Sequence, residues 1–349
     1  MKKALWVFGF LGLWVLAGCV RPQSAPQPSA PQAKSNRVVL YCSVDDVYAR
    51  PILRDLERKT GLKIDPLFDT EAAKTAGLAN RIRAEKSRPQ GDVFWSSALL
   101  QTLLLAREGL LEPYQSPAAQ DIPAAFKAKD GMWTGLGVRA RVGVQHYVNP
   151  AQDTRAWIPG LIEQLADAHQ VGISNPQFGT ASDWSACLCT RWGKERTLKF
   201  FRTLKKTRVS VLPGNSVVAE KVARGDLSYG VTDTDDYFAA KKQGEISILS
   251  LNAKHIEGTF IPGSVALLKN APHAENAKKL VGALLSVETE KRLVETMTGV
   301  MPLRPGIEVK QPELKTLSKA VKNAPDDTAK WPAAWDEIRE PLAEILLKD

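Results

Sequence analysis

The segment Arg-Val-Val-Leu-Tyr-Cys-Ser-Val spans residues 37–44 and begins a pattern that runs through the chain. A short apolar run of this kind is typical of a buried strand. Helical and strand-like segments then alternate, with a helix expected over 47–60, a strand over 62–68, a helix over 71–86, a strand over 91–95 and a helix over 97–108. This order predicts a mainly parallel sheet covered by helices, in which ligands bind beyond the carboxyl ends of the strands.

The remainder of the chain predicts a second lobe. Strands and helices alternate again from about 171 to 251, while 133–148 and 259–268 are β-rich and suited to crossing between two lobes. A chain of 349 residues is also too long for one small core. We therefore expect an α/β fold of two lobes, each a mainly parallel sheet flanked by helices, joined by two crossing strands. The predicted boundaries are 37–140 plus 262–349 for lobe 1 and 141–261 for lobe 2, with the ligand between them.

The N-terminus predicts export. Lys2 and Lys3 precede a short apolar run that ends in Leu16-Ala17-Gly18-Cys19, which is typical of a signal peptide over residues 1–18 and is too short for a membrane span. The ending resembles the lipobox of bacterial lipoproteins, which implies lipidation of Cys19. An ordinary cleaved signal with a chance cysteine is the alternative. Residues 19–36, rich in proline and small polar residues, predict a flexible tether to the membrane. The expected location is the cell envelope, at the outer surface of the cytoplasmic membrane or at the outer membrane.

Composition narrows the function further. Hydrophobic residues make up 44% and charged residues 24%, which are ordinary globular values. The net charge of +9 is spread along the chain without an arginine-rich block, and an exported protein does not routinely meet nucleic acid, so we expect no nucleic-acid partner. Beyond Cys19 the cysteines are odd in number and the histidines do not cluster, which favours buried free thiols over a disulfide framework or a metal site. These cysteines are Cys42, Cys187 and Cys189.

An ordered set of motifs resembles the ferric-ion-binding branch of class II periplasmic solute-binding proteins. The motifs are Tyr41-Cys42-Ser43-Val44-Asp45, Gly91-Asp92-Val93-Phe94-Trp95, residues 135–142 with Arg139-Ala140-Arg141, residues 175–180, Gly214-Asn215-Ser216 and Gly230-Val231-Thr232-Asp233. They occur in the family's order and span nearly the whole mature chain. The resemblance implies a monomer that closes on a hinge and delivers its ligand to an ABC permease and its ATPase, with no catalysis and no enzyme cofactor.

The anion-binding half of the family's site is matched here. The matching residues are Thr180, Ala181, Ser182, Asn215 and Ser216. Hydroxyls, an amide and backbone N–H groups at the start of two helices can form a cradle for an oxyanion. Capping of those helices by Ser182 and Asn215 is a compatible alternative.

The metal-binding half departs from the family. Where ferric binders carry adjacent tyrosines, residues 233–237 read Asp-Thr-Asp-Asp-Tyr, and where many carry a histidine, residues 43–46 read Ser-Val-Asp-Asp. The family's glutamate position falls at Ser96 or Ser97. Carboxylates suit a hard cation and equally suit an ammonium group, while Asp235 alternatively caps the next helix. The residues that we expect to face a ligand or metal are Ser43, Asp45, Ser96, Ser97, Asp233, Asp235 and Asp236.

Two arginines complete the predicted site. Arg139 and Arg141 alternate along a strand, so their side chains share one face. They contact an anion in the cleft or brace the crossing strands, and the sequence leaves both open. Trp95 and Tyr237 are expected to be packing residues that also line the pocket.

The ligand predicted first is Fe(III) held with a synergistic oxyanion, mainly by resemblance. The alternative is a phosphonate or phosphate ester, with or without an amine. An exported hydrolase is disfavoured because the chain has no Gly-x-Ser-x-Gly or His-Glu-x-x-His motif. A sensor accessory protein would use the same fold and stays an alternative.

Overall fold

The computed structural model describes residues 35–69, 76–146, 170–207, 209–249, 260–322, 324 and 327–347. The predicted signal peptide, Cys19 and nearly all of the tether lie outside the described residues, as does the start of the helix predicted over 71–86. Asn36–Asp349 form one compact unit. In the part of the chain that the structure describes, no helix is long and apolar enough to span a membrane.

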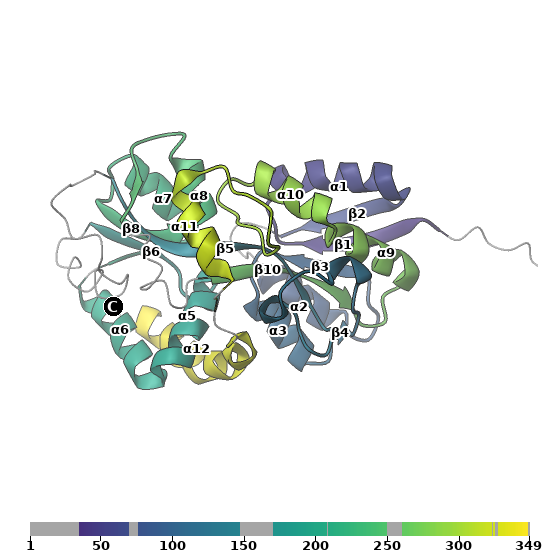
Figure 1. The fold of residues 1–349 in the computed structure, drawn as a ribbon. Helices are drawn as coiled ribbons and strands as arrows, with labels where there is room; N and C mark the ends of the chain where they lie inside the picture. The colour runs from purple at the N-terminus through teal and green to yellow at the C-terminus, as the bar shows by residue number, and fades with distance from the viewer. Residues whose placement is uncertain are drawn as a thin grey trace, which may run out of the picture. The chain divides into compact units, whose positions relative to one another are not determined.

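The strands pair in the order β2-β1-β3-β10-β5-β8-β6-β7, with β4 beside β10 and β9 beside β5 (Figure 1). Their bounds are β1 Arg37–Cys42, β2 Lys63–Phe68, β3 Val93–Ser96, β4 Leu111–Glu112, β5 Thr134–Gln145, β6 Val171–Ser174, β7 Ser210–Leu212, β8 Tyr229–Asp233, β9 Ser247–Ile248 and β10 Phe260–Leu268. β1 runs parallel to β2 and β3, and β6 runs parallel to β7 and β8.

Strand β5 joins two sets of strands. Its first half pairs antiparallel with β10 beside β3, and its second half pairs antiparallel with β8 and β9. All twelve residues of β5 are buried, so it runs through the interior from one set to the other. The structure thus confirms a two-lobed α/β fold with mainly parallel sheets joined by two crossing strands, β5 and β10.

Helices cover both sets of strands. Their bounds are α1 Asp46–Thr60, α2 Ala76–Ala84, α3 Leu100–Arg107, α5 Gly179–Trp192, α6 Lys194–Lys206, α7 Asn215–Ala223, α8 Thr234–Ala240, α9 Ala274–Leu284, α10 Val287–Thr296, α11 Pro312–Val321 and α12 Trp331–Leu347, with short 3-10 turns at Pro117–Ala119, Ala124–Phe126 and Thr328–Lys330.

Helix α1 shows why these sequences become helices. It buries Ala49, Ile52, Leu53 and Leu56, which recur at the spacing of one helical face. Gly61 ends the helix in a left-handed conformation with φ 69°, and its N–H donates to the carbonyl of Glu57. The predicted helix over 47–60 and its stop at Gly61 are confirmed.

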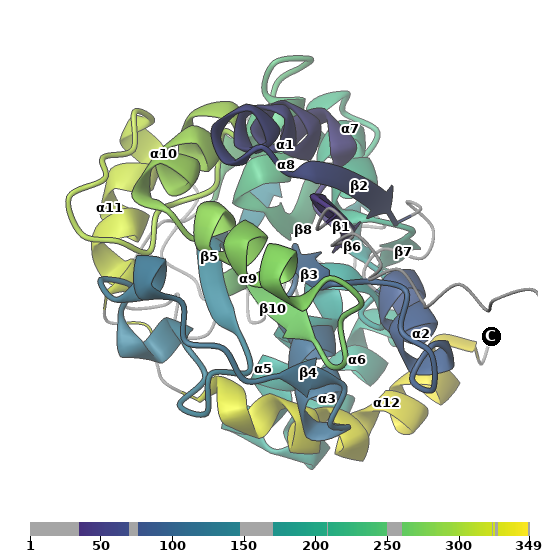
Figure 2. The same cartoon turned by 90° about the vertical axis from the view of Figure 1, so that its right-hand side faces the viewer.

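The last helix packs against helices that cover both sets of strands. α12 lies against α5 and α6, which belong to the second set, and also touches α3 of the first set (Figure 2). Trp335 and Ile338 of α12 share a buried apolar cluster with Trp184 and Phe200. The exact lobe boundaries of the sequence analysis stay a prediction.

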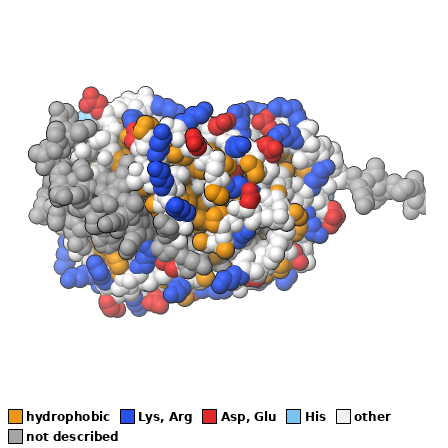
Figure 3. All heavy atoms as spheres, viewed as in Figure 1, with side chains coloured by type: hydrophobic (Ala, Val, Ile, Leu, Met, Phe, Trp, Pro, Cys, Tyr) orange, Lys and Arg blue, Asp and Glu red, His pale blue; other side chains and the backbone are white. Residues whose placement is uncertain are grey.

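The distribution of charged side chains and the burial of the cysteines agree with what the composition predicts. Lys and Arg side chains are spread over the face seen in Figure 3, with Asp and Glu among them. Cys42, Cys187 and Cys189 are buried, and none of the three forms a disulfide in the described part of the chain. Burial raises the pKa of the Cys187 thiol to about 12, so this thiol stays neutral.

Candidate functional site

A cavity, called the cleft pocket here, lies where β1, β3, β6 and β8 end beside the crossing strand β5. The predicted site residues that line it are Ser43, Asp45, Ser97, Arg139, Thr180, Asn215, Ser216, Asp233, Asp235 and Asp236. Strand ends from both sets therefore meet at one place, as the parallel order of the strands requires.

The core of the site is an ion pair between Arg141 and Asp233. The two residues are register partners on β5 and β8. Arg141 Nη1 lies 3.0 Å from Asp233 Oδ1, and both side chains are almost completely buried. The guanidinium also lies over the ring of Trp184, 5.2 Å from its centroid. A buried charge needs such pairing, because an isolated one is strongly penalised.

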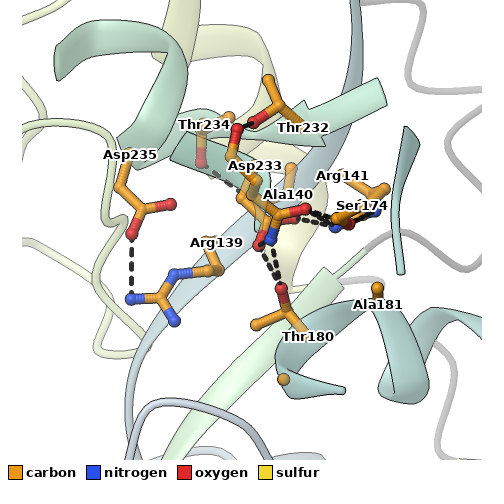
Figure 4. A network of polar contacts seen from close by, with 12 residues as sticks. Arg139, Ala140, Arg141, Ser174, Thr180, Ala181, Thr232, Asp233, Thr234 and Asp235 are labelled. Carbon is orange, nitrogen blue, oxygen red and sulfur yellow. Dashed lines mark hydrogen bonds and ion pairs between the residues drawn. The ribbon is translucent and has the colours of Figure 1, made fainter. Parts of the chain in front are cut away.

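This pair is enclosed by a hydrogen-bond network (Figure 4). Asn215 Oδ1 accepts from Arg141 Nη1 at 2.7 Å and from the Ser174 hydroxyl. Asn215 Nδ2 donates to Thr180 Oγ1 at 2.8 Å and to Asp233 Oδ2 at 2.9 Å. The Thr180 hydroxyl donates to Asp233, and Arg141 Nη2 donates to Ser174 Oγ at 2.8 Å. The side chains of Thr180 and Asn215 therefore point their donors at Asp233.

The backbone N–H groups at the starts of two helices, α5 and α7, are suited to binding an anion. α5 begins at Gly179 and α7 begins at Asn215, and both helix starts line the cleft pocket. The first N–H groups of a helix have no acceptor within the helix, and the helix dipole favours negative charge there. Ser216, the second residue of α7, adds a hydroxyl to this edge.

Arg139 and Asp235 form a second ion pair, in which each side chain has one polar atom without a hydrogen-bond partner. Arg139 Nη2 lies 3.0 Å from Asp235 Oδ2, and Nη1 donates to the carbonyl of Ser97 at 2.6 Å. Arg139 Nε and Asp235 Oδ1 are buried and have no hydrogen-bond partner. Burial raises the pKa of Asp235, although Arg139 acts to lower it. Each member of the pair thus keeps one polar atom available beside the cleft pocket.

An adjoining cavity, called the acidic chamber here, continues from the cleft pocket. Its charged lining residues are Asp45, Asp46, Asp69, Asp235 and Asp236, and no Lys, Arg or His is among the described residues that line it. Tyr48 borders the same chamber. Its pKa is raised by burial and by Asp235, Asp45 and Asp236 nearby. The chamber therefore favours a positive group.

The three carboxylates at and just after the end of β8 lie close together but differ in their surroundings. Oxygen atoms of Asp233, Asp235 and Asp236 lie within 4.8 Å of one another. Asp233 is already paired with Arg141, and Asp235 with Arg139. A cation placed among the three would compete with two guanidinium groups.

The serines of the first set of strands hold their turn together. Ser43 Oγ accepts from the Ser97 backbone N–H at 2.9 Å, and Ser96 Oγ donates to the Ala98 carbonyl at 2.6 Å. Ser43 and Ser97 line the cleft pocket, whereas Ser96 lines a neighbouring cavity instead.

The structure places other predicted residues away from the cleft pocket. Ala181 and Ser182 are buried within α5, and the Ser182 hydroxyl donates to the carbonyl of Gly179. α5 begins three residues before Ser182, so the expected helix start and cap at that serine were wrong. Asp235 lies inside α8, which begins at Thr234, and it is not the residue that precedes the helix. Tyr237 is buried and packs against Phe238.

Sequence reasoning missed several residues of the cleft pocket. Asn175, Phe178 and Gly214 lay inside quoted motifs, whose position after strands was a usable signal. Met297 comes from the end of α10 and had no such signal, because only the fold brings it beside Arg139.

Two lobes joined by crossing strands, with a polar cavity at strand ends of both sets, define a solute-binding protein. The chain belongs to the family of bacterial extracellular solute-binding proteins, whose family model matches residues 43–296.

Relatives and solved structures agree with this family. The major ferric iron-binding protein of Neisseria gonorrhoeae is 25% identical over 77% of this chain and 82% of its own. A putative 2-aminoethylphosphonate-binding periplasmic protein of Salmonella typhimurium is 28% identical over 76% of this chain and 77% of its own. The structure of iron-bound HitA from Pseudomonas aeruginosa superposes with a TM-score of 0.74 at 19% identity, covering 87% of this chain and 98% of that one. HitA is similar to this chain in fold, and the names of the two relatives refer to different ligands.

Proposed function

We propose that the protein is the receptor of an ABC importer and captures a small organic phosphonate or phosphate that carries a positive group. The observation that carries this proposal is the pairing of Asp233 with Arg141 and of Asp235 with Arg139. Two arginines beside the carboxylates suit a ligand with both signs of charge better than a bare cation.

The anionic end of the ligand binds at the helix starts. The N–H groups at the beginnings of α5 and α7 meet at the cleft pocket, as does the Ser216 hydroxyl. Helix N-termini of this kind are ready-made sites for phosphorus oxyanions. Arg139 also lines the cleft pocket, and its Nε, which has no hydrogen-bond partner, supplies a charged donor there.

The cationic end of the ligand extends into the acidic chamber. Asp45 and Asp236 border both cavities, and Asp235 Oδ1 is a buried acceptor without a partner. An ammonium group has donors for all three carboxylates and needs no coordination geometry. The relative named for 2-aminoethylphosphonate supports a ligand of this type.

Ferric iron with a synergistic oxyanion is the second candidate. It is supported by the close approach of Asp233, Asp235 and Asp236 and by the relative named for ferric iron. The donor set fits iron less well. No tyrosine is among the described residues lining the cleft pocket, and two of the three carboxylates are already paired with arginines.

The proposed function also includes a location and partners. The predicted lipidation of Cys19 would hold the receptor in the cell envelope, where an ABC permease and its ATPase would receive the ligand. The family assignment and the relatives named as binding proteins support a receptor that carries out no catalysis.

Calorimetry with three probes tests the ligand. 2-Aminoethylphosphonate should bind more tightly than methylphosphonate, because only the first fills the acidic chamber. Ferric citrate should release little heat and leave no iron on the protein by elemental analysis. Retained iron in purified protein, together with no binding of either phosphonate, would establish the second candidate instead.

A further inference from the structure

A buried carboxylate links two helices that follow strands of different sets. Asp183 lies on α5, which follows β6, and it is completely buried. Its oxygens accept from the backbone N–H groups of Leu99 and Leu100, both at 2.8 Å. Leu99 precedes α3 and Leu100 is its first residue, and this helix follows β3 in the other set of strands. α3 has no side-chain cap of its own, so Asp183 caps it from a distance.

The linked helices flank the cleft pocket. Ser97 lies two residues before Leu99, Thr180 lies three residues before Asp183, and both line the pocket. β5 is the strand shared by the two sets, so a movement that separates them would pivot at the crossing strands. Opening the pocket on this side would pull α3 and α5 apart and break both hydrogen bonds of Asp183.

We propose that Asp183 is a proton-sensitive clasp that holds the ligand-free protein closed by capping α3 from α5. This role is independent of the ligand, so it stands or falls separately from the function proposed above. In the open protein the carboxylate would be exposed to water and the start of α3 would be uncapped.

Protonation of Asp183 follows from its burial. Burial raises the pKa of Asp183 to about 7, while the two backbone hydrogen bonds act to lower it. The charged groups that face it are Asp233 at the end of β8, which raises the pKa, and Arg139 on β5, which lowers it. The thiol of Cys187, one turn along α5, is neutral because its own pKa is raised to about 12.

The raised pKa of Asp183 determines how closure depends on pH. An exposed Asp183 in the open form has an ordinary pKa near 4, so closing takes up a proton between about pH 4 and pH 7. The contribution of Asp183 to closure is therefore complete below this window and is lost as the pH rises through about 7. A protonated carboxyl group keeps acceptor capacity for the N–H groups of α3.

Hydrogen exchange of the full chain without ligand tests the clasp. Exchange is followed by mass spectrometry at about pH 5.5 and about pH 8 and corrected for the intrinsic rate at each pH. In the unaltered protein, segments 97–104 and 179–186 should lose protection together at the higher pH, by up to about tenfold per pH unit within the window. Asp183→Asn should show the same protection at both pH values, because nothing titrates at this position.

Asp183→Ala removes the clasp, and both segments should lose protection at about pH 5.5 by about tenfold, the factor expected when a buried donor loses its hydrogen-bond partner. At about pH 8, where the unaltered protein has already lost this contribution, the variant should differ from it much less. Protection of the α1 segment reports whether the variant is folded. Ser286→Ala is the matched control, since Ser286 caps α10 by accepting from the Thr289 N–H within one region. It should affect only the first turn of α10.

Two results would overturn the clasp. One is loss of protection in Asp183→Ala that is confined to the first turn of α3, which would make Asp183 a local cap. The other is equal corrected protection of both segments at the two pH values in the unaltered protein.

Discussion

Arg141 and Asp233 stand opposite each other on β5 and β8, and their side chains form a 3.0 Å ion pair at the centre of the site. This pair fixes the direction of its neighbours, because Thr180 and Asn215 both donate to Asp233. It therefore holds in place three side chains that line the cleft pocket, those of Asp233, Thr180 and Asn215.

The first prediction concerns that pair. Arg141→Met leaves Asp233 buried without a counter-ion, and breaking a buried pair costs about 3–5 kcal/mol. We expect the free energy of unfolding in urea to fall by about that amount. The double variant Arg141→Met/Asp233→Asn should recover much of the loss, because no unpaired charge remains. An unchanged midpoint for Arg141→Met alone would show that the pair does not stabilise the fold.

The second prediction separates two serines at the helix starts. Ser216→Ala should weaken methylphosphonate binding by roughly 1–3 kcal/mol, the scale of a lost hydrogen bond to a charged group. Ser182→Ala should leave the dissociation constant unchanged, because the Ser182 hydroxyl is used on the Gly179 carbonyl. Calorimetry compares the two. Equal losses would mean that the anion lies deeper along α5 than the structure indicates.

The third prediction concerns the acidic chamber. Asp235→Asn and Asp236→Asn keep the side-chain shape and remove charge, so each should weaken 2-aminoethylphosphonate by roughly 1–3 kcal/mol. Methylphosphonate has no ammonium group, and its affinity should stay the same or rise slightly. Calorimetry on both ligands measures the difference. If both variants bind 2-aminoethylphosphonate as tightly as the unaltered protein, the chamber does not hold the cationic end.

The fourth prediction concerns the anchor. Cys19→Ser removes the thiol that the lipobox-like ending predicts to be acylated, so the variant should carry no fatty acid and should not be processed as a lipoprotein. Mass spectrometry of the N-terminal peptide measures both. Acylation at the normal level in this variant would remove the anchor from the proposal.

Much of the fold could be predicted from the sequence, but helix starts could not always be. The run over 37–44 and the stop at Gly61 are local signals, and β1 and α1 follow them. The start of α5 was misplaced because a serine normally signals a cap. Here the residue before the helix is Phe178, in an extended conformation. Asp183, which follows Ser182, caps the start of α3 instead.

The sequence alone predicted that residues from several strand ends gather at one place. Parallel strands bring their carboxyl ends to one edge, so residues after β1, β3, β6 and β8 meet whatever the details of packing. The parallel sheets and the two crossing strands could be predicted because the alternation of strands and helices is a local pattern that repeats along the chain.

The use of each side chain depended on contacts across the fold. Arg141 meets Asp233 only because β5 pairs with β8 in one register, and a shift of one residue would turn both side chains to the other face. The same holds for Asp183, whose partners lie more than eighty residues away in the chain. Local periodicity places a residue on a face, whereas burial and pairing with distant charges determine whether its polar atoms face the ligand or the protein interior.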